Sequence, residues 1–550
     1  RQRQMCIRDS DYTIQKDSRY YNPLSSAGPK SGSDAQTAKG FIEYGKLISS
    51  TSLNYVRTFA RKHHLDVLAA YEIESYQTDH ASGEKSKLPS DKLTEPDNAA
   101  VLNSFKSATQ AYRMISYLSR LNYDYDDRYY IAGSYRRDGS SRLSPNNRWG
   151  NFWSVSGMWH LGNENFMKAV KPVLSDVKIR ASYGVNGNQP GSYYGYKGLY
   201  SYGENYMEAA GSYESAQPND LLTWEKNYSL NLGIDLSFIN RIFASLEYYN
   251  RDTKDLLYSL PISATTGFTS YLSNIGRLNN KGVEFELRTL NVVSNDFNWT
   301  SVFNLSHNRN KIVSLNGLLD QTIEGTWFIH KVGLPYHTFY VKEFAGVDPL
   351  TGSAQYYLNT KNEDGSYNRE LTTDAAKAES IPYKTATPKV SGGFTNILNY
   401  KWIDLTFTLT YSLGGYSFDK LGTYIENGSS SIYSSRYNLP AYMINRWQKP
   451  GDQTDIPRFV YGEPATSTNS SRYIHSTDHL RLKNFTLGFT LPNQWTQKLM
   501  IDKIRVYFSG NNLLTWAKWK QYDPETPVNG EVFCEAPAMR TFSFGAQLSF

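Results

Sequence analysis

The chain has 550 residues, a length that predicts either three or four globular domains or one very large sheet. Aromatic residues make up 15% of the chain and tyrosine alone supplies 44 residues, yet hydrophobic residues reach only 39%, a pairing that is unusual for ordinary packed cores. The formal net charge of +6 is spread along the chain with basic and acidic residues interleaved, so it does not indicate nucleic-acid binding.

Residues 1–40 show no pattern that predicts a strand. The opening RQRQMCIRDS fits neither a strand nor a helix cap, so we expect residues 1–40 to form a partial loop or to include a non-native start. No charged start, apolar stretch and small-residue cleavage site follow one another there, and no export signal is visible. No run of 18 apolar residues occurs, which excludes a helical membrane span. We therefore expect an amino-terminally truncated chain whose principal fold covers residues 41–550.

Strand-like alternation of apolar and polar residues recurs along most of the chain. Successive side chains of a strand point to opposite faces of its sheet, so these segments predict strands with one apolar face and one wet face. The apolar members of the four clearest segments are Val177, Ile179, Ala181 and Tyr183; Leu230, Leu232, Ile234, Leu236 and Phe238; Leu405, Phe407, Leu409, Tyr411 and Leu413; and Phe542, Phe544, Ala546, Leu548 and Phe550. We predict an all-β fold, namely a transmembrane antiparallel β-barrel.

The connections between these strands alternate between short and long. Short ones lie near Asn240 and at 290–297, and long ones cover 186–223, 250–280, 416–479 and 516–538. Between 311 and 387 the strand count requires an even number of additional strands, which a hairpin within a loop would supply. The apolar phase of RLKNFTLGFTL changes near Lys483 and Asn484, which predicts a bulge. The tally is roughly 15–17 barrel strands, as the alternation indicates.

Residues that could carry chemistry form no recognised constellation. There is no G-x-S-x-G elbow and no phosphate-binding glycine loop, although acidic residues are too numerous to exclude a paired-carboxylate site by counting. His63 and His64 are adjacent and so point to opposite faces, and Cys6 and Cys534 lie at opposite ends of the chain. We therefore expect no catalytic residues, no metal site and no cofactor.

Four arginines, Arg136, Arg137, Arg142 and Arg148, gather around the Asp138-Gly139 turn signal. They could attract anionic sugars or phosphates through charge-assisted hydrogen bonds. The alternative is a hairpin turn flanked by solvated charges, and we favour that interpretation because loop tips are polar by default.

Aromatic residues in the long connections are the candidates for substrate binding, because their faces can stack on a bound ligand. They are Tyr193, Tyr194 and Tyr196 in a tyrosine-rich loop that continues through Tyr200, Tyr202 and Tyr206, together with Trp327, Trp516 and Trp519. The alternative is structural, since tyrosine and tryptophan also collect in belts at membrane interfaces. Phe550, the last residue of an alternating strand, resembles a signal for barrel assembly.

Six motifs, in order, resemble those of SusC/RagA-type TonB-dependent transporters. They are RRDGSSR at 136–142, NNRWGNFWSVSGMW at 146–159, LSDVKIRASYGVNGNQ at 174–189, FAGVDPLTG at 344–352, LRLKNFTLGFTLP at 480–492, and IRVYFSGNNLLTW at 504–516 with YDPE following. The resemblance extends from about residue 40 to the end of the chain, and six ordered motifs are more specific than any one of them.

This resemblance implies a 22-stranded barrel in the outer membrane that imports glycans or peptides and is not an enzyme. It also implies a SusD-like surface lipoprotein as a lid, contact with outer-membrane lipid, and the inner-membrane TonB complex as the energy source. The sequence shows no plug domain and no TonB box, so we expect that TonB acts through a part of the protein that precedes residue 1. Two alternatives remain open: a soluble or surface-attached β-rich glycan-binding protein, and a passive porin.

Overall fold

The computed structural model describes residues 2–22, 35–90, 92–207, 209–315, 321–324, 327–426, 439–460, 469–496, 501–525 and 529–549. Strands account for most of these residues, and the α-helices are two short ones, α1 (Lys420–Ile425) and α2 (Asn493–Thr496). No helix among the described residues is long and apolar enough to cross a membrane.

Sixteen strands of the described chain form one main sheet, which confirms the predicted 15–17 strands. In sheet order they are β1 (Gln2–Tyr21), β2 (Gln36–Phe59), β3 (His63–Ser86), β4 (Val101–Tyr125), β5 (Tyr129–Ser140), β6 (Trp149–His160), β7 (Leu174–Asn188), β10 (Glu225–Phe238), β11 (Ile242–Lys254), β14 (Arg277–Val293), β15 (Phe297–Ser314), β23 (Val390–Tyr400), β24 (Ile403–Leu413), β27 (His479–Thr490), β28 (Lys503–Ala517) and β30 (Thr541–Ser549). The strands follow one another in chain order, as in a meander.

The chain divides into two compact units. The amino-terminal unit comprises Arg1–Trp159, Ala181–Leu230 and Thr253–Ile275. The carboxy-terminal unit comprises His160–Arg180, Asn231–Asp252 and Gly276–Phe550.

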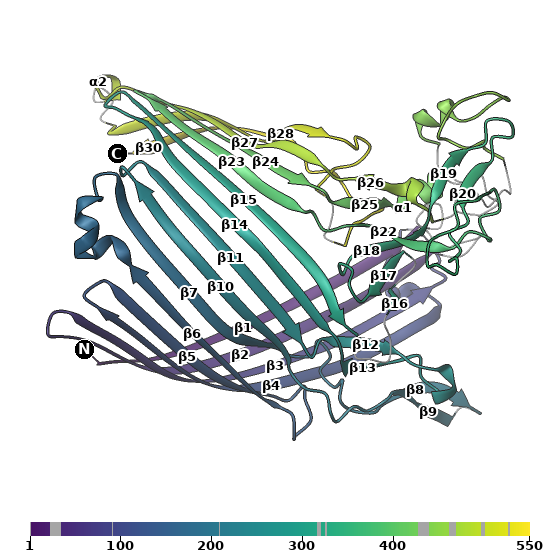
Figure 1. Ribbon diagram of the computed structural model, residues 1–550. Coiled ribbons are helices and arrows are strands. Elements are labelled where there is room, and N and C mark those ends of the chain that lie inside the picture. Colours follow the sequence, from purple (N-terminus) through teal and green to yellow (C-terminus); the bar gives the residue numbers. More distant parts are fainter. Residues whose placement is uncertain are drawn as a thin grey trace. The chain divides into compact units, whose positions relative to one another are not determined.

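In the amino-terminal unit, β1 to β6 are antiparallel neighbours joined by short turns at one end and longer connections at the other (Figure 1). The short turns are 60–62 and 126–128, where Ala60, Arg61, Asp126 and Asp127 have φ between 50° and 57°. Two successive residues with positive φ match the right-handed twist of the flanking strands. The turns therefore set the register of both hairpins.

The first residues of the chain differ from the loop expected over residues 1–40. Gln2–Tyr21 forms β1 and pairs along its whole length with β2, from Gln2 opposite Tyr55 to Tyr21 opposite Gln36. Alternation in β1 is poor, so the sequence pattern gives no strand signal. The backbone pairing with β2 holds β1 in the sheet regardless of its side chains.

In the carboxy-terminal unit, β14, β15, β23, β24, β27, β28 and β30 are antiparallel neighbours, and Figure 1 shows the first four side by side as long ribbons. The predicted bulge in β27 is confirmed, because adjacent residues of β24, Thr408 and Leu409, pair with Asn484 and Leu482 and leave Lys483 out of that ladder. Phe542 and Phe544 of β30 are 62% and 82% exposed, and the Phe508 ring of β28 stacks on Phe542 and contacts Phe544 at a tilt.

The described residues between 315 and 389 contribute no strand to the main sheet, since β15 pairs directly with β23. The alternation of strand direction in the main sheet is therefore kept, as the even number of additional strands predicted from the sequence requires. The described part of the region contains two small sheets where a single hairpin was expected. The first small sheet comprises β16 (Gln321–Glu324), β17 (Phe328–Lys331), β18 (Thr338–Lys342) and β22 (Ser380–Thr385); the second comprises β19 (Phe344–Val347), β20 (Ala354–Tyr357) and β21 (Leu371–Thr372).

The other long connections also form small sheets. They contain β8 (Leu199–Tyr206) with β9 (Ala209–Ala216), β12 (Leu257–Pro261) with β13 (Ser270–Asn274), and β25 (Tyr416–Asp419) with β26 (Ile474–Ser476) and β29 (Glu531–Val532). Most members of the buried clusters lie in the long connections, for example Phe339, Val341, Phe418 and Tyr473, whereas Phe152 of one cluster lies on β6 of the main sheet. Apolar side chains on the main sheet remain largely exposed, as expected for strands that face lipid.

The two faces of β24 provide a test of this arrangement. Phe407 is paired with Phe485 on the apolar face, whereas the Thr408 hydroxyl on the opposite face bonds the Thr395 hydroxyl at 3.0 Å. We predict that Phe407→Arg costs about 2–4 kcal/mol of barrel stability, because an arginine would face hydrocarbon, while Thr408→Arg costs much less. Heat-modifiable gel migration of the two variants from membrane fractions would measure this. Equal loss in both variants would contradict the assignment of faces.

Candidate functional site

The two faces of the main sheet differ in chemistry within each unit. We call the face that carries Tyr71 and Tyr117 in the amino-terminal unit, and Phe407 and Phe544 in the carboxy-terminal unit, the apolar face. The opposite face is called the polar face. The register of β3 and β4 puts Tyr71 opposite Tyr117, and that of β28 and β30 puts Phe508 opposite Phe544.

Aromatic rings form two rows on the apolar face of the amino-terminal unit. Rings in contact have centroids 4.9–6.5 Å apart. The lower row lies at the short-turn end of the strands and comprises Phe59, His63, Tyr125, Tyr129 and Trp159. The upper row lies nearer the long connections and comprises Tyr71, Tyr117 and Trp149. His63 and Tyr71 are eight residues apart on β3, about 26 Å along the strand or roughly 20 Å across a bilayer at the usual tilt. This separation approaches the height of about 25 Å of the apolar band that lies between the two interfacial belts of a membrane barrel.

Charges on the polar face are held by hydrogen-bonded partners. In the amino-terminal unit, Arg136 donates from Nε to Asp138 at 2.8 Å and from Nη2 to the Ser116 hydroxyl at 2.9 Å. In the carboxy-terminal unit, Arg180 Nη1 donates to Glu247 at 2.6 Å and Nε donates to Asp235 at 3.2 Å. Such pairs explain the charges found in mid-strand, because a hydrated face tolerates them.

Tyr193, one of the predicted binding residues, joins a cluster on the polar face of the amino-terminal unit. We call Tyr76, Tyr112, Tyr193 and Arg142 the tyrosine–arginine cluster. The three rings lie with centroids 5.3–6.2 Å apart, and the Arg142 guanidinium lies 4.0 Å from the Tyr112 ring centroid and 4.6 Å from that of Tyr193. The Tyr112 hydroxyl donates to Glu74, whose carboxylate also pairs with Lys46 at 3.2 Å.

Tyr194 and Tyr196 lie beside this cluster but have different surroundings. The Tyr194 ring contacts Tyr193 at 6.3 Å, and its hydroxyl accepts the backbone N–H of Ala111 at 3.1 Å. Tyr196 packs against the buried cluster that includes Leu143 and Trp224. Both residues therefore secure the tyrosine-rich loop to the unit.

The predicted tryptophans lie in three different environments. Trp327 stacks on Phe418 at 4.8 Å beneath the Lys420 ammonium. Trp519 is only 7% exposed and packs against His475 at 4.5 Å and Tyr522 at 5.1 Å. Trp516 is 53% exposed and pairs with Leu480 on the apolar face, a position that favours the interfacial belt over ligand stacking.

Phe550, the predicted assembly signal, lies outside the described residues. The strand that precedes it, β30, keeps the predicted alternation, with Phe542, Phe544 and Leu548 exposed on the apolar face.

Buried ionisable groups hold together the connections of the carboxy-terminal unit. Arg472 pairs with Glu426 at 2.5 Å, and the Tyr442 hydroxyl donates to the same carboxylate at 2.5 Å. Asp419 accepts the backbone N–H of Gly422 at 2.7 Å and so caps α1. Burial raises the pKa of Asp419 to about 6, and burial beside Arg472 lowers the pKa of His475 to about 4.

The YDPE motif contributes a second buried ionic group. Arg481 of β27 is 2% exposed at its side chain, pairs with Asp523, and donates to Glu525 at 2.8 Å. Lys483, the bulge residue, also reaches Glu525 at 2.6 Å. Sequence reasoning missed this group because its members lie more than 40 positions apart, and only the motif order hinted at a shared role.

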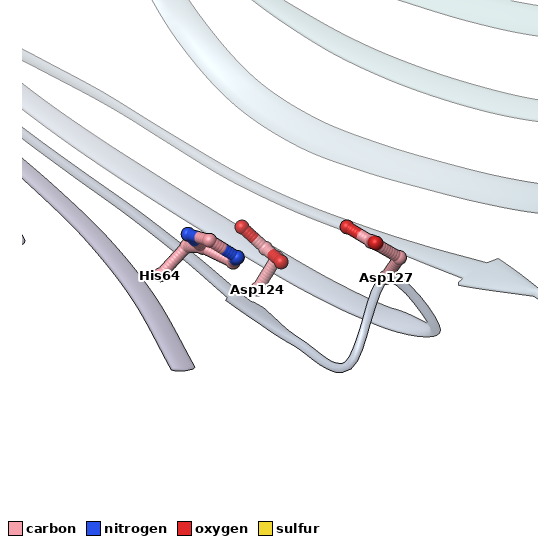
Figure 2. A group of neighbouring side chains, drawn as sticks. All are labelled: His64, Asp124 and Asp127. Atoms are coloured by element: carbon pink, nitrogen blue, oxygen red, sulfur yellow. The ribbon is translucent and has the colours of Figure 1, made fainter. Parts of the chain in front are cut away.

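One group of described side chains has residue types that suit a metal ion, and Figure 2 shows His64, Asp124 and Asp127 turned toward one another. Their potential ligand atoms lie within 4.8 Å of one another, whereas ligands on a zinc ion are separated by about 3.3 Å. His64 Nδ1 bonds the Thr58 hydroxyl at 2.7 Å, and Asp127 interacts with Tyr130. We assign no metal to this group.

A sheet with an apolar, aromatic-bordered face and a face of paired charges defines a β-barrel membrane protein. The family described as TonB dependent receptor-like, beta-barrel, matches residues 7–513, and the chain belongs to it. The fold is thus the predicted all-β barrel, and the chain is part of an outer-membrane protein.

Individual relatives agree with this assignment. TonB-dependent receptor P3 of Formosa agariphila is 31% identical over 536 residues, which are 92% of this chain and 52% of the relative. TonB-dependent receptor SusC of Bacteroides thetaiotaomicron is 31% identical over 501 residues, 86% of this chain and 47% of SusC. The chain spans about half the length of these curated relatives.

Solved structures give the same result. A chain of the RagAB peptide transporter superposes with a TM-score of 0.86 at 28% identity, over 100% of this chain and 60% of the other. The RagAB peptide importer in its closed-closed state gives a TM-score of 0.87, also at 28% identity and over 100% and 60% of the two chains. The predicted SusC/RagA resemblance is confirmed.

Asp419 gives a pH-dependent prediction. Because burial raises its pKa to about 6, the folded protein holds this proton more tightly than the unfolded chain does. Its stabilising contribution is complete below about pH 4 and is lost as the pH rises through 6. We predict that Asp419→Asn protects α1 better than wild type at pH 8, by roughly 1–3 kcal/mol, and equally at pH 4. Hydrogen exchange of residues 416–426 measures this, and an identical pH profile in the two proteins would contradict it.

Arg481 gives a second prediction. Arg481→Met leaves the Asp523 and Glu525 carboxylates without their buried partner, at a cost of roughly 3 kcal/mol. We expect faster proteolytic cleavage within 518–540, with partial recovery when Asp523→Asn and Glu525→Gln are added. Lys483→Met is the matched control: its 41%-exposed side chain contributes about 1 kcal/mol or less. Cleavage of Arg481→Met at the wild-type rate would rule out this role for the ion group.

Proposed function

We propose that the chain is the barrel portion of a TonB-dependent importer of oligosaccharides or peptides across the outer membrane. The observation that carries the proposal is the combination of family membership with a polar face of paired charges opposite an aromatic-bordered apolar face. In a barrel the polar face lines the water-filled interior through which a solute passes. The names of two relatives, SusC and the RagAB peptide transporter, support a nutrient as that solute.

The protein binds and moves its substrate without changing it chemically, so it is not an enzyme and needs no cofactor. Its partners are a SusD-like surface lipoprotein at the external mouth and the TonB complex, which acts through a part of the protein outside this chain. The exposed Tyr200, Tyr202 and Tyr206 of β8, together with Tyr193, Tyr194 and Tyr196, supply aromatic surface for ligand contact. Trp327, Trp516 and Trp519 are weaker binding candidates. Trp327 and Trp519 pack against other aromatic rings, and Trp516 lies on the apolar face.

A soluble glycan-binding protein is the second function that the sequence allows. It would bury its large apolar side chains beneath another layer of structure. The 82% exposure of Phe544 and the belt of Tyr129 and Trp159 disfavour it, since a soluble protein rarely exposes so large an apolar surface.

Uptake by living cells tests the importer proposal. We expect cells producing the full-length protein to take up fluorescent oligosaccharide or peptide pools, and to lose this uptake when the gene is deleted, when TonB is deleted, or when a protonophore collapses the proton gradient. Each loss follows because the energy reaches the barrel only through TonB. Uptake that persists without TonB would show a passive pore and contradict the proposal.

A further inference from the structure

The four arginines around 136–148 differ in how their charges are balanced. Arg136 is neutralised by Asp138 and Glu72, with nitrogen–oxygen distances of 2.8 and 3.3 Å. The Arg137 guanidinium lies 5.1 Å from the Trp149 ring, in the upper aromatic row of the apolar face. Arg142 belongs to the tyrosine–arginine cluster on the polar face, where its neighbours are tyrosine rings and backbone carbonyl groups.

Arg142 has aromatic and carbonyl neighbours but no counter-ion. Its guanidinium lies against the rings of Tyr112 and Tyr193, and Nη1 donates to the carbonyl oxygens of Pro190 at 2.9 Å and Gly191 at 3.3 Å. Among the residues that the structure describes, no carboxylate lies within 4.0 Å of it. Glu74, the carboxylate that touches the cluster, is already engaged by Lys46 and Tyr112.

The guanidinium also keeps unused donors. Nε is shielded from solvent and bonds no described atom, an arrangement that is unfavourable unless another group accepts a hydrogen bond from it. Nη2 donates to none of the described residues and is not among the shielded atoms. A guanidinium stays charged at any physiological pH, so the charge itself remains unbalanced.

The position of the cluster places this charge where a ligand can meet it. Tyr76 and Tyr112 are register partners on the polar face, and Tyr76 lies beyond the upper aromatic row, toward the long-connection end of β3. The tyrosine-rich loop closes over them, and the Ser140 hydroxyl ties it down by donating to Gln189 at 2.7 Å. The cluster therefore lies at the end of the polar face that adjoins the long connections.

We propose that Arg142 binds the carboxylate of an acidic ligand, so that the protein prefers uronate-bearing oligosaccharides or acidic peptides to their neutral counterparts. The planar fork of a guanidinium matches a carboxylate, and the tyrosine rings hold the fork in place while excluding water. The inference deepens the proposed function and rests on it. Two kinds of ligand supply the same carboxylate chemistry, and the experiment separates them.

Calorimetry with the full-length protein in detergent tests the proposal. One pair of probes is a trigalacturonate and its methyl ester, which share a sugar backbone but differ in charge. The other pair is an oligo-glutamate peptide and its glutamine counterpart. We expect at least one acidic probe to bind about 10- to 100-fold more tightly than its neutral partner, and Arg142→Gln to abolish that preference. The acidic probe that binds identifies the source of the carboxylate.

Arg137→Gln is the matched control, because it removes a neighbouring charge from the apolar face, and it should leave the preference unchanged. Arg142→Gln could also loosen the tyrosine-rich loop, so Arg142→Lys serves as a second variant that keeps the charge and should retain part of the preference. Equal binding of acidic and neutral probes, or a preference that survives Arg142→Gln, would overturn the proposal. TonB-dependent uptake of neutral pools would then persist, whereas failure of the importer proposal would remove all TonB-dependent uptake.

Discussion

The structure depends on one constraint, which is that every backbone polar group of a strand in lipid must be paired with a neighbouring strand. Continuous pairing fixes the side-chain period at two, so each strand has one face for hydrocarbon and one for water. The aromatic rows, the paired arginines and the exposed phenylalanines of β30 all follow from that division. It also explains why most members of the buried hydrophobic clusters lie in the connections.

The constraint also explains what could be predicted from the sequence. Segments with strict alternation, such as 405–413, are strands in the structure, and the phase change near Lys483 is a bulge. Both are local patterns that a two-faced strand requires. β1 escaped prediction because its side chains alternate poorly and only its pairing with β2 defines it. The strands of the small sheets, two to eight residues long, are too short to show a period.

The candidate sites were less predictable because contacts between distant residues create them. The sequence identified Tyr193 as an exposed aromatic of a loop, but not that it would meet Tyr76, more than 100 residues earlier in the chain. It grouped four arginines by proximity, and only their contacts in the folded chain separate the balanced Arg136 from Arg142. Trp519 resembled a free stacking surface, yet His475 and Tyr522 occupy its surroundings.

The bulge at Lys483 has a consequence for how this protein can change in evolution. Losing a residue from a regular strand turns every later side chain over, so lipid-facing and water-facing positions exchange. Relative to β24, β27 already holds one additional residue at 483. A one-codon deletion there would restore an uninterrupted ladder with β24 and leave Phe485 and Leu487 in contact with lipid. The ladder with β28 would keep its irregularity, because Asn512 and Leu513 lie opposite position 483. The same deletion at another codon of β27 would invert everything that follows it, which makes position 483 the strand's one natural site for a length change.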